Sequence, residues 1–209
     1  MRYKPQFVIL LTLMVLSSSC NSGQWTLTSP PPPGWRSPVS DLFVDETAFP
    51  EGWRIEFPED IITDPTINHV GISWGRPDVA GTVYQVIWRA YTIEDAMEEY
   101  AKISQQPLLR PHYTPAPKNF YVEFRPPPEV DFQSQVADES YLACGWLEWA
   151  FCEIVARYHN YVVYMNLDLA AEYGGHTSSG LTYVEIEKVM RAMDAKFAEA
   201  ITEWYAETQ

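Results

Sequence analysis

The chain has 209 residues, with 14 Lys and Arg side chains against 28 Asp and Glu and a net charge of −14. Hydrophobic residues make up 46% of the chain, which is too many for a disordered acidic tail and enough for one packed core. Nucleic acid is excluded as the expected partner, because binding to phosphates depends on Lys and Arg contacts.

The first twenty residues have the layout of an export signal. Arg2 and Lys4 precede an apolar run over residues 7–16, and three serines then lead to Cys20. A run of this length is too short to span ~30 Å of hydrocarbon at ~1.5 Å per residue, so we expect a cleaved signal rather than a transmembrane helix.

The segment resembles a bacterial lipoprotein signal, in which small residues precede a Cys that is lipidated and becomes the mature N-terminus. The resemblance implies a signal peptide over residues 1–19, an acyl chain such as palmitate on Cys20, and a polypeptide held outside the membrane. Ser17 stands where that family usually has Leu, and an ordinarily cleaved, secreted product is the alternative. Cleavage removes two positive charges and changes the net charge from −14 to −16.

Residues 20–40 are predicted to form a tether, followed by a single domain over residues 41–209. The tether contains four consecutive prolines, Pro30–Pro33, which favour an extended polyproline II spacer. Its two large apolar residues are Trp25 and Trp35. They either pack on the membrane interface or on the domain, or they remain exposed to solvent.

Alternating apolar residues predict three strands in the first part of the domain. The first strand is indicated by Trp53, Ile55 and Phe57, and the second by Val70, Ile72 and Trp74. The third covers residues 82–91, with Tyr84, Val86 and Trp88 on one side and Gln85 and Arg89 on the other. Thr92 with Asp95 indicates the start of a helix, which includes Met97 on its apolar side and ends before Pro107. A Pro-rich crossing and a short strand over residues 120–124 follow.

Three antiparallel strands are predicted over residues 140–146, 151–158 and 161–169, with a turn at His159-Asn160 between the last two. After a loop over residues 173–180, Thr182 and Glu185 form a capping box for a long amphipathic helix, with Asp194 on its polar side. We therefore expect an α+β domain with a mainly antiparallel sheet packed against two amphipathic helices, on one face or, as in an α/β/α sandwich, on both. Its expected core includes Trp88, Trp146, Phe197 and Trp204.

Cys144 and Cys152 flank the turn of a predicted hairpin. If the hairpin turns about Glu148, these two residues lie opposite each other on the apolar face. Export exposes them to oxidising conditions, so a structural disulfide is the main prediction and two buried thiols are the alternative.

The sequence contains no local pattern for catalysis, metal binding or a cofactor, and we expect none of the three. His69, His112, His159 and His176 are not spaced as metal ligands, and no Gly-rich phosphate loop or nucleophile elbow occurs. Asp138 and Glu139 are the one acidic pair retained as a candidate. The loop over residues 173–180 precedes a helix N-terminus that could hold an anion.

Phe49-Pro50-Glu51-Gly52-Trp53, followed by alternating strands and a closing helix, resembles the opening of PsbP-like domains and of extracytoplasmic sensor-type domains. The resemblance implies a non-catalytic domain with a central antiparallel sheet that acts as an accessory to envelope or membrane complexes. The tether, the many aromatic residues and the lack of a catalytic pattern favour a non-catalytic cell-envelope module, anchored to the membrane through its lipid, that binds a protein or a small apolar ligand. The alternatives are a carrier of a small apolar ligand or lipid and a hydrolase whose site is assembled from distant residues.

Overall fold

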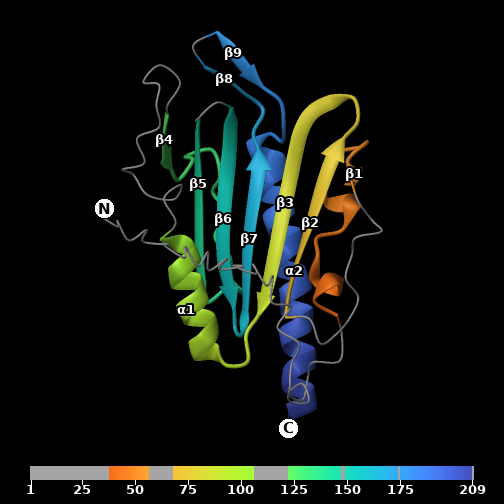
Figure 1. The fold of residues 1–209 in the computed structure, drawn as a ribbon, viewed down its shortest axis with the longest axis vertical. Helices are drawn as coiled ribbons and strands as arrows, with labels where there is room; N and C mark the ends of the chain where they lie inside the picture. Colours follow the sequence, from red (N-terminus) through yellow and green to blue (C-terminus); the bar gives the residue numbers. More distant parts are fainter. Residues whose placement is uncertain (1–37, 57–67, 106–121, 147–148, 174, 209) are drawn as a thin grey trace, which may run out of the picture.

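The fold is built around one antiparallel sheet, seen in a computed structural model that describes residues 38–56, 68–105, 122–146, 149–173 and 175–208. Seven strands run in the order β1-β2-β3-β7-β6-β5-β4, and every pairing within this sheet is antiparallel (Figure 1). The elements are η1 (Val39–Leu42), η2 (Glu46–Ala48), β1 (Arg54–Ile55), β2 (His69–Arg76), β3 (Val79–Arg89), α1 (Ile93–Ser104), β4 (Val122–Arg125), β5 (Glu139–Trp146), β6 (Ala150–Tyr158), β7 (Tyr161–Asp168), β8 (Ala171–Tyr173), β9 (His176–Ser178) and α2 (Tyr183–Thr208). The predicted α+β class is confirmed.

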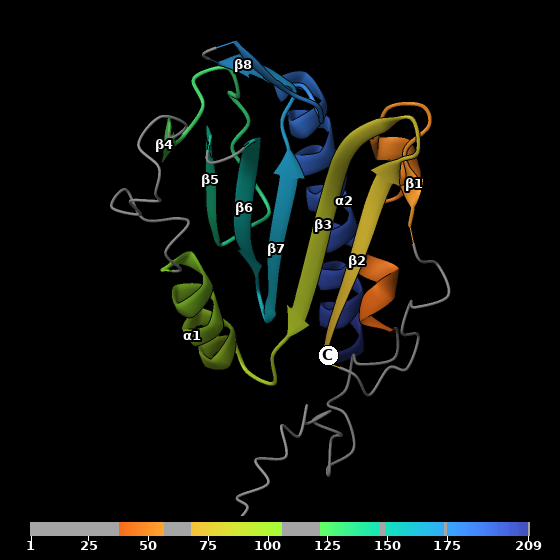
Figure 2. The same ribbon diagram turned by 45° about the horizontal axis from the view of Figure 1, so that its top comes forward.

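The two helices cover opposite faces of the sheet (Figure 2). Side chains alternate along each strand, so neighbouring residues of β6 contribute to different cores. Ile154 packs in the large core that contains Val189 and Phe197 of α2. Val155 instead packs in a smaller core with Ala96 and Ile103 of α1.

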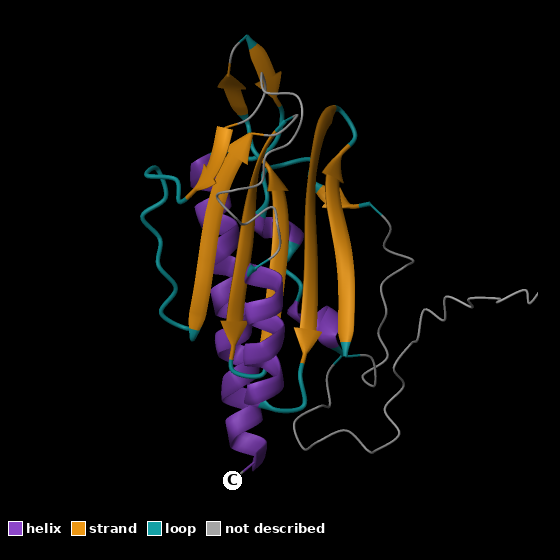
Figure 3. Ribbon diagram, turned by 60° about the vertical axis from the view of Figure 1, so that its left-hand side comes forward, coloured by secondary structure: helices purple, strands orange, loops and turns teal. Residues whose placement is uncertain are grey.

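Both helices begin as the sequence predicts. The Thr182 backbone N–H donates to Glu185 Oε2 at 2.7 Å, and the Glu185 N–H donates to Thr182 Oγ1 at 3.4 Å, which completes the capping box. Thr92 Oγ1 accepts from the Asp95 N–H at 3.0 Å at the start of α1. With 26 residues, α2 is ~39 Å long at ~1.5 Å per residue and extends beyond the strands at its C-terminal end (Figure 3).

The prediction placed Gln85 and Arg89 on the polar side of their strand, but both are buried on the face of β3 that packs against α2. They alternate with Tyr84 and Trp88, which lie on the α1 face. Gln85 Oε1 accepts a hydrogen bond from the Val44 N–H at 3.2 Å. The polar residue is tolerated inside because it satisfies a backbone donor that would otherwise be buried without a partner.

The Pro-x-Gly-Trp pattern has a local structural reason. The Trp53 N–H donates to the Pro50 carbonyl at 3.3 Å. Gly52 has a φ of 90°, a positive angle that favours glycine at this position of a turn. The turn brings Trp53 onto Phe49, whose ring in turn packs against Trp74, with centroids 5.8 and 5.1 Å apart.

Several sequence expectations need correction. The loop predicted over residues 173–180 contains strand β9 and the end of β8, which pair as a small hairpin. Met97 was assigned to the apolar side of its helix but is 49% exposed, and Asp194 was assigned to the polar side but is buried. Val39, expected in the tether, is buried in the large core. Trp25, Trp35, Phe57, His112 and the side chain of Trp204 lie outside the described residues.

Candidate functional site

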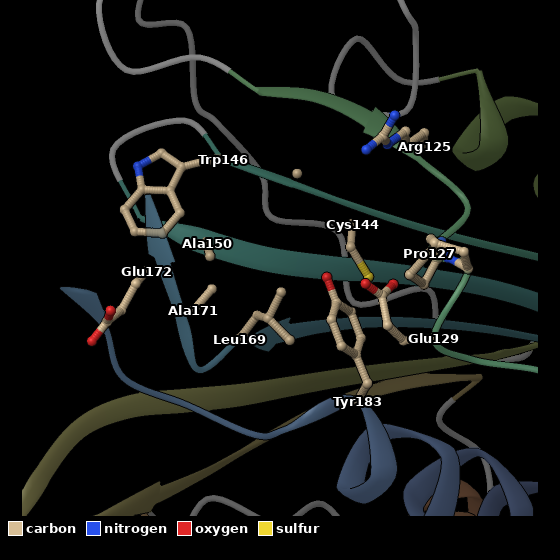
Figure 4. Close-up of a pocket in the computed structure, with 12 residues that line it drawn as sticks. Arg125, Pro127, Glu129, Cys144, Trp146, Ala150, Leu169, Ala171, Glu172 and Tyr183 are labelled. Atoms are coloured by element: carbon tan, nitrogen blue, oxygen red, sulfur yellow. The ribbon is translucent and has the colours of Figure 1, made fainter. Parts of the chain in front are cut away.

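A pocket opens where the end of the β5–β6 hairpin meets β8 and the first turn of α2 (Figure 4). Its volume is about 180 Å³. Figure 4 shows Trp146 and Glu172 on one side of it and Tyr183 and Glu129 on the other. The pocket is lined by Arg125, Pro127, Pro128, Glu129, Cys144, Gly145, Trp146, Ala150, Leu169, Ala171, Glu172 and Tyr183.

The floor of the pocket is apolar and belongs to the main core. Trp146, Ala150 and Leu169 are buried and join the same cluster as the α2 side chains. Leu169 is fixed at this end of the sheet, because its N–H donates to the Ala150 carbonyl at 2.9 Å. The floor is therefore held by hydrogen-bonded strands, which gives the pocket a fixed shape.

The rim of the pocket carries charge. Arg125, Glu129 and Glu172 are exposed, and none of their side chains forms a hydrogen bond or ion pair with another described residue. The pKa of Tyr183 is raised mainly by burial and further by Glu129, with Arg125 acting in the opposite direction. A cavity of ~150 Å³ holds one benzene ring, so this pocket has room for one apolar group of a bound molecule. The charged side chains of the rim are then next to the polar groups of that molecule.

The predicted cysteine pairing forms one wall of the pocket. Cys144 lies directly opposite Cys152, with Leu142 opposite Ile154 and Trp146 opposite Ala150, so the predicted register is confirmed. The two sulfurs lie at disulfide distance. Cys144 lines the pocket, and the cross-link joins the two strands that carry its floor.

The candidate acidic pair has a structural role. Asp138 and Glu139 both bind the buried Arg157, with Asp138 Oδ2 3.0 Å from Nη1 and Glu139 Oε2 2.8 Å from Nε. Asp138 Oδ2 also accepts from the His159 N–H at 2.7 Å. Because Arg157 balances these carboxylates and holds the β6–β7 turn beside them, they do not form a pair available for acid–base chemistry.

The described histidines belong to different elements. His69 begins β2 and contacts the Asn68 side chain, His159 lies in the β6–β7 turn, and His176 begins β9. Within the described ranges, no three His, Cys, Asp or Glu side chains come together as a metal site. The start of α2 is capped by Glu185, so its N-terminus already has an acidic partner.

The sequence analysis missed two buried carboxylates. Asp194 of α2 accepts from the Tyr158 hydroxyl at 2.7 Å and from the Ser134 hydroxyl at 2.8 Å, which ties residues 130–137 to the helix. Glu153 lies in the middle of β6 and is 1% exposed. A glutamate at the centre of a strand that is apolar from Ala150 to Ala156 on either side of it was the available signal for Glu153.

No family model, curated protein or solved structure matches the chain in the comparisons with known proteins. None of the helices in the described part of the chain is long and apolar enough to cross a membrane.

Proposed function

We propose that the protein is a non-catalytic cell-envelope lipoprotein whose domain binds an apolar group of a ligand or partner protein in the pocket beside Trp146. The observation that carries this proposal is the pocket itself, with its core-anchored apolar floor and three rim charges that have no partner in the described chain. Such a combination of an apolar cavity with a few convergent polar groups is typical of binding sites.

The tether supports the same proposal. A lipidated Cys20 would attach the chain by acyl groups, and the segment up to residue 38 would separate the lipid from the folded domain. The mature charge of −16 would repel anionic head groups and keep the domain in the aqueous phase. The PsbP-like resemblance fits this role through its order of strands followed by a closing helix.

Two pockets lined by described residues are too small to be the cavity of a carrier. Neither this pocket nor a second one of about 260 Å³ beside Arg54 and Arg76 reaches the ~300 Å³ at which sites for small organic molecules begin. A single side chain or the end of an acyl group is a better match in size.

A pocket-filling substitution tests the proposal. We expect N-acetyl-phenylalaninamide, titrated into the isotope-labelled full-length chain, to shift NMR signals of pocket residues in a saturable way. Ala150→Leu should abolish these shifts, because the added carbons occupy the floor of the pocket. Ala195→Leu makes the same change at an exposed position of α2 and should leave them intact.

Circular dichroism would establish that both variants are folded, and Ala171→Leu provides a second filled pocket at a half-buried position. No saturable response in the unsubstituted chain, or equal responses in the folded Ala150→Leu and Ala195→Leu variants, would contradict the proposal.

A further inference from the structure

The pocket beside Trp146 has an aromatic residue and a carboxylate on each of its two sides. Figure 4 shows Trp146 with Glu172 on one side and Tyr183 with Glu129 on the other. The four residues come from separate parts of the chain, because Trp146 ends β5, Glu172 lies in β8, Glu129 lies between β4 and β5, and Tyr183 begins α2. A group inside the pocket therefore meets an aromatic ring and a negative charge from either side.

The charges around the pocket favour a cation. Glu129 and Glu172 outnumber Arg125, and neither carboxylate forms a hydrogen bond or an ion pair with another described residue. The positive end of α2 does not offset them, because Glu185 Oε2 accepts from the Thr182 N–H at 2.7 Å and caps that end. The whole chain has a net charge of −14, which attracts cations to its surface.

The floor of the pocket selects the kind of cation. The side chains of Ala150, Leu169 and Ala171 end in carbon and give an N–H group no acceptor. A primary ammonium or a guanidinium would lose its water there without replacement, which is costly. A quaternary ammonium has no N–H group and presents methyl groups, so it can pack on this floor.

We propose that the pocket binds a trimethylammonium group, with Trp146, Tyr183, Glu129 and Glu172 around the cation. The volume of about 180 Å³ suits a group with the compact shape of tert-butyl, since ~150 Å³ holds one benzene ring. Aromatic rings attract quaternary ammonium ions through the negative face of their π-system. The inference rests on the proposed function, because it names the chemical class of the ligand for the same pocket.

Arg125 fits a ligand that also carries an anionic group. Its guanidinium is exposed on the rim, and both Arg125 and Glu129 act electrostatically on Tyr183. A phosphate or carboxylate attached to the trimethylammonium group would lie near this guanidinium, which binds such anions well. The shared chemistry is that of choline, and its source is either a free small molecule or the headgroup of a lipid.

Ligands of one shape and different charge test the proposal. Choline, 3,3-dimethyl-1-butanol and 3,3-dimethylbutyrate are a cation, a neutral molecule and an anion of closely similar shape. Each would be titrated into the isotope-labelled full-length chain in a maltoside detergent, with NMR signals of pocket residues as the readout. We expect choline to bind with a Kd of about 1 mM or lower, at least about fivefold tighter than the other two.

Ethanolamine controls for the general attraction of cations to an acidic chain. It has the charge of choline without the methyl groups, so it should bind at least about fivefold more weakly. Glycerophosphocholine distinguishes the two sources. Binding as tight as that of choline would assign the pocket to a lipid headgroup, and binding at least about tenfold weaker to a free small cation; both outcomes support the inference.

Substitutions separate the charges from the ring. Glu129→Gln and Glu172→Gln should each weaken choline at least about threefold and leave 3,3-dimethyl-1-butanol unchanged. Glu98→Gln is the matched control, because it removes the same charge at an exposed position of α1, on the other face of the sheet. Tyr183→Phe keeps the ring and should bind choline normally, whereas Tyr183→Leu should lose at least about fivefold. Circular dichroism would establish that each variant is folded.

Several results would overturn the inference. Equal affinities for choline and 3,3-dimethyl-1-butanol would do so and leave the proposed apolar pocket in place. Tighter binding of 3,3-dimethylbutyrate would indicate an anion site at Arg125 instead. Equal affinities for choline and ethanolamine, or equal losses in Glu172→Gln and Glu98→Gln, would assign the effect to net charge. No saturable response to any of these ligands or to N-acetyl-phenylalaninamide would overturn both this inference and the proposed function.

Discussion

Breaking the bond between Cys144 and Cys152 should destabilise the domain by an amount set by the short loop that the bond closes. The two cysteines are eight positions apart, so the closed loop contains nine residues. The loop-entropy relation gives about 2.6 kcal/mol for a loop of this length. The loss is of this size because the cross-link limits mainly the unfolded chain, while the hairpin is already held by its own hydrogen bonds.

Urea unfolding with and without a reductant measures this contribution without replacing any side chain. We expect the free energy of unfolding to fall by about 2.6 kcal/mol in the reduced protein. The Cys144→Ala/Cys152→Ala variant should resemble the reduced protein and should not respond to the reductant. Because Cys152 is completely buried, the variant also loses packing contacts and should be somewhat less stable than the reduced chain.

Thiol alkylation followed by mass spectrometry decides whether the bond was present and then broken. Two outcomes would refute the reasoning: alkylation of Cys144 or Cys152 before any reductant is added, or an unchanged unfolding curve after both thiols have been released.

Two further predictions concern the buried carboxylates. Asp194→Ala should lower the free energy of unfolding by about 2–4 kcal/mol, because it leaves the Tyr158 and Ser134 hydroxyls without their acceptor. The control is Ser134→Ala, which removes only one of the two donors and should therefore lose less stability in the same urea unfolding experiment. Equal losses in the two variants would contradict this prediction. Burial raises the pKa of Glu153 above its ordinary 4.5, so the folded state holds the proton more tightly, and this stability is lost as pH rises through the raised pKa. Glu153→Gln should therefore be more stable than the unsubstituted chain at pH 7. In thermal unfolding this difference should shrink as pH falls from the raised pKa toward 4.5 and stay constant at lower pH; a difference that grows on acidification would reverse the assigned sign.

The sequence predicts those parts of the fold in which local chemistry and global packing agree. The β5–β6 hairpin follows from alternation and from the cysteines that its register brings together. The start of α2 follows from the Thr182–Glu185 capping box, which needs only four residues to form. In these segments one short pattern is enough to determine the local structure.

Other features depend on contacts between distant segments. Gln85 is buried because of a backbone donor at Val44, and Asp194 because of hydroxyls on Tyr158 and Ser134. Polarity alone placed both side chains in solvent, since the partners that make burial tolerable are 36 to 60 residues away.

The candidate site and the opposite face of the sheet illustrate the same limit. The pocket combines residues of β4, β5, β6, β8 and α2, which no local motif brings together. On the opposite face, alternation alone places Glu153 of β6 on the same side as Trp149, which precedes that strand. Only the strand order β3-β7-β6 adds Tyr84 and Asn166 to them.

The cell-envelope location in the proposed function depends most directly on Cys20, and the mature N-terminus is the measurement that tests it. The chain would be produced in a bacterium with lipoprotein processing, recovered from the membrane fraction, and its N-terminal peptide analysed by mass spectrometry. The account predicts a peptide that begins at an acylated Cys20 and a Cys20→Ala variant that leaves the membrane fraction. An unmodified Cys20, or unchanged partitioning of the Cys20→Ala variant, would contradict it.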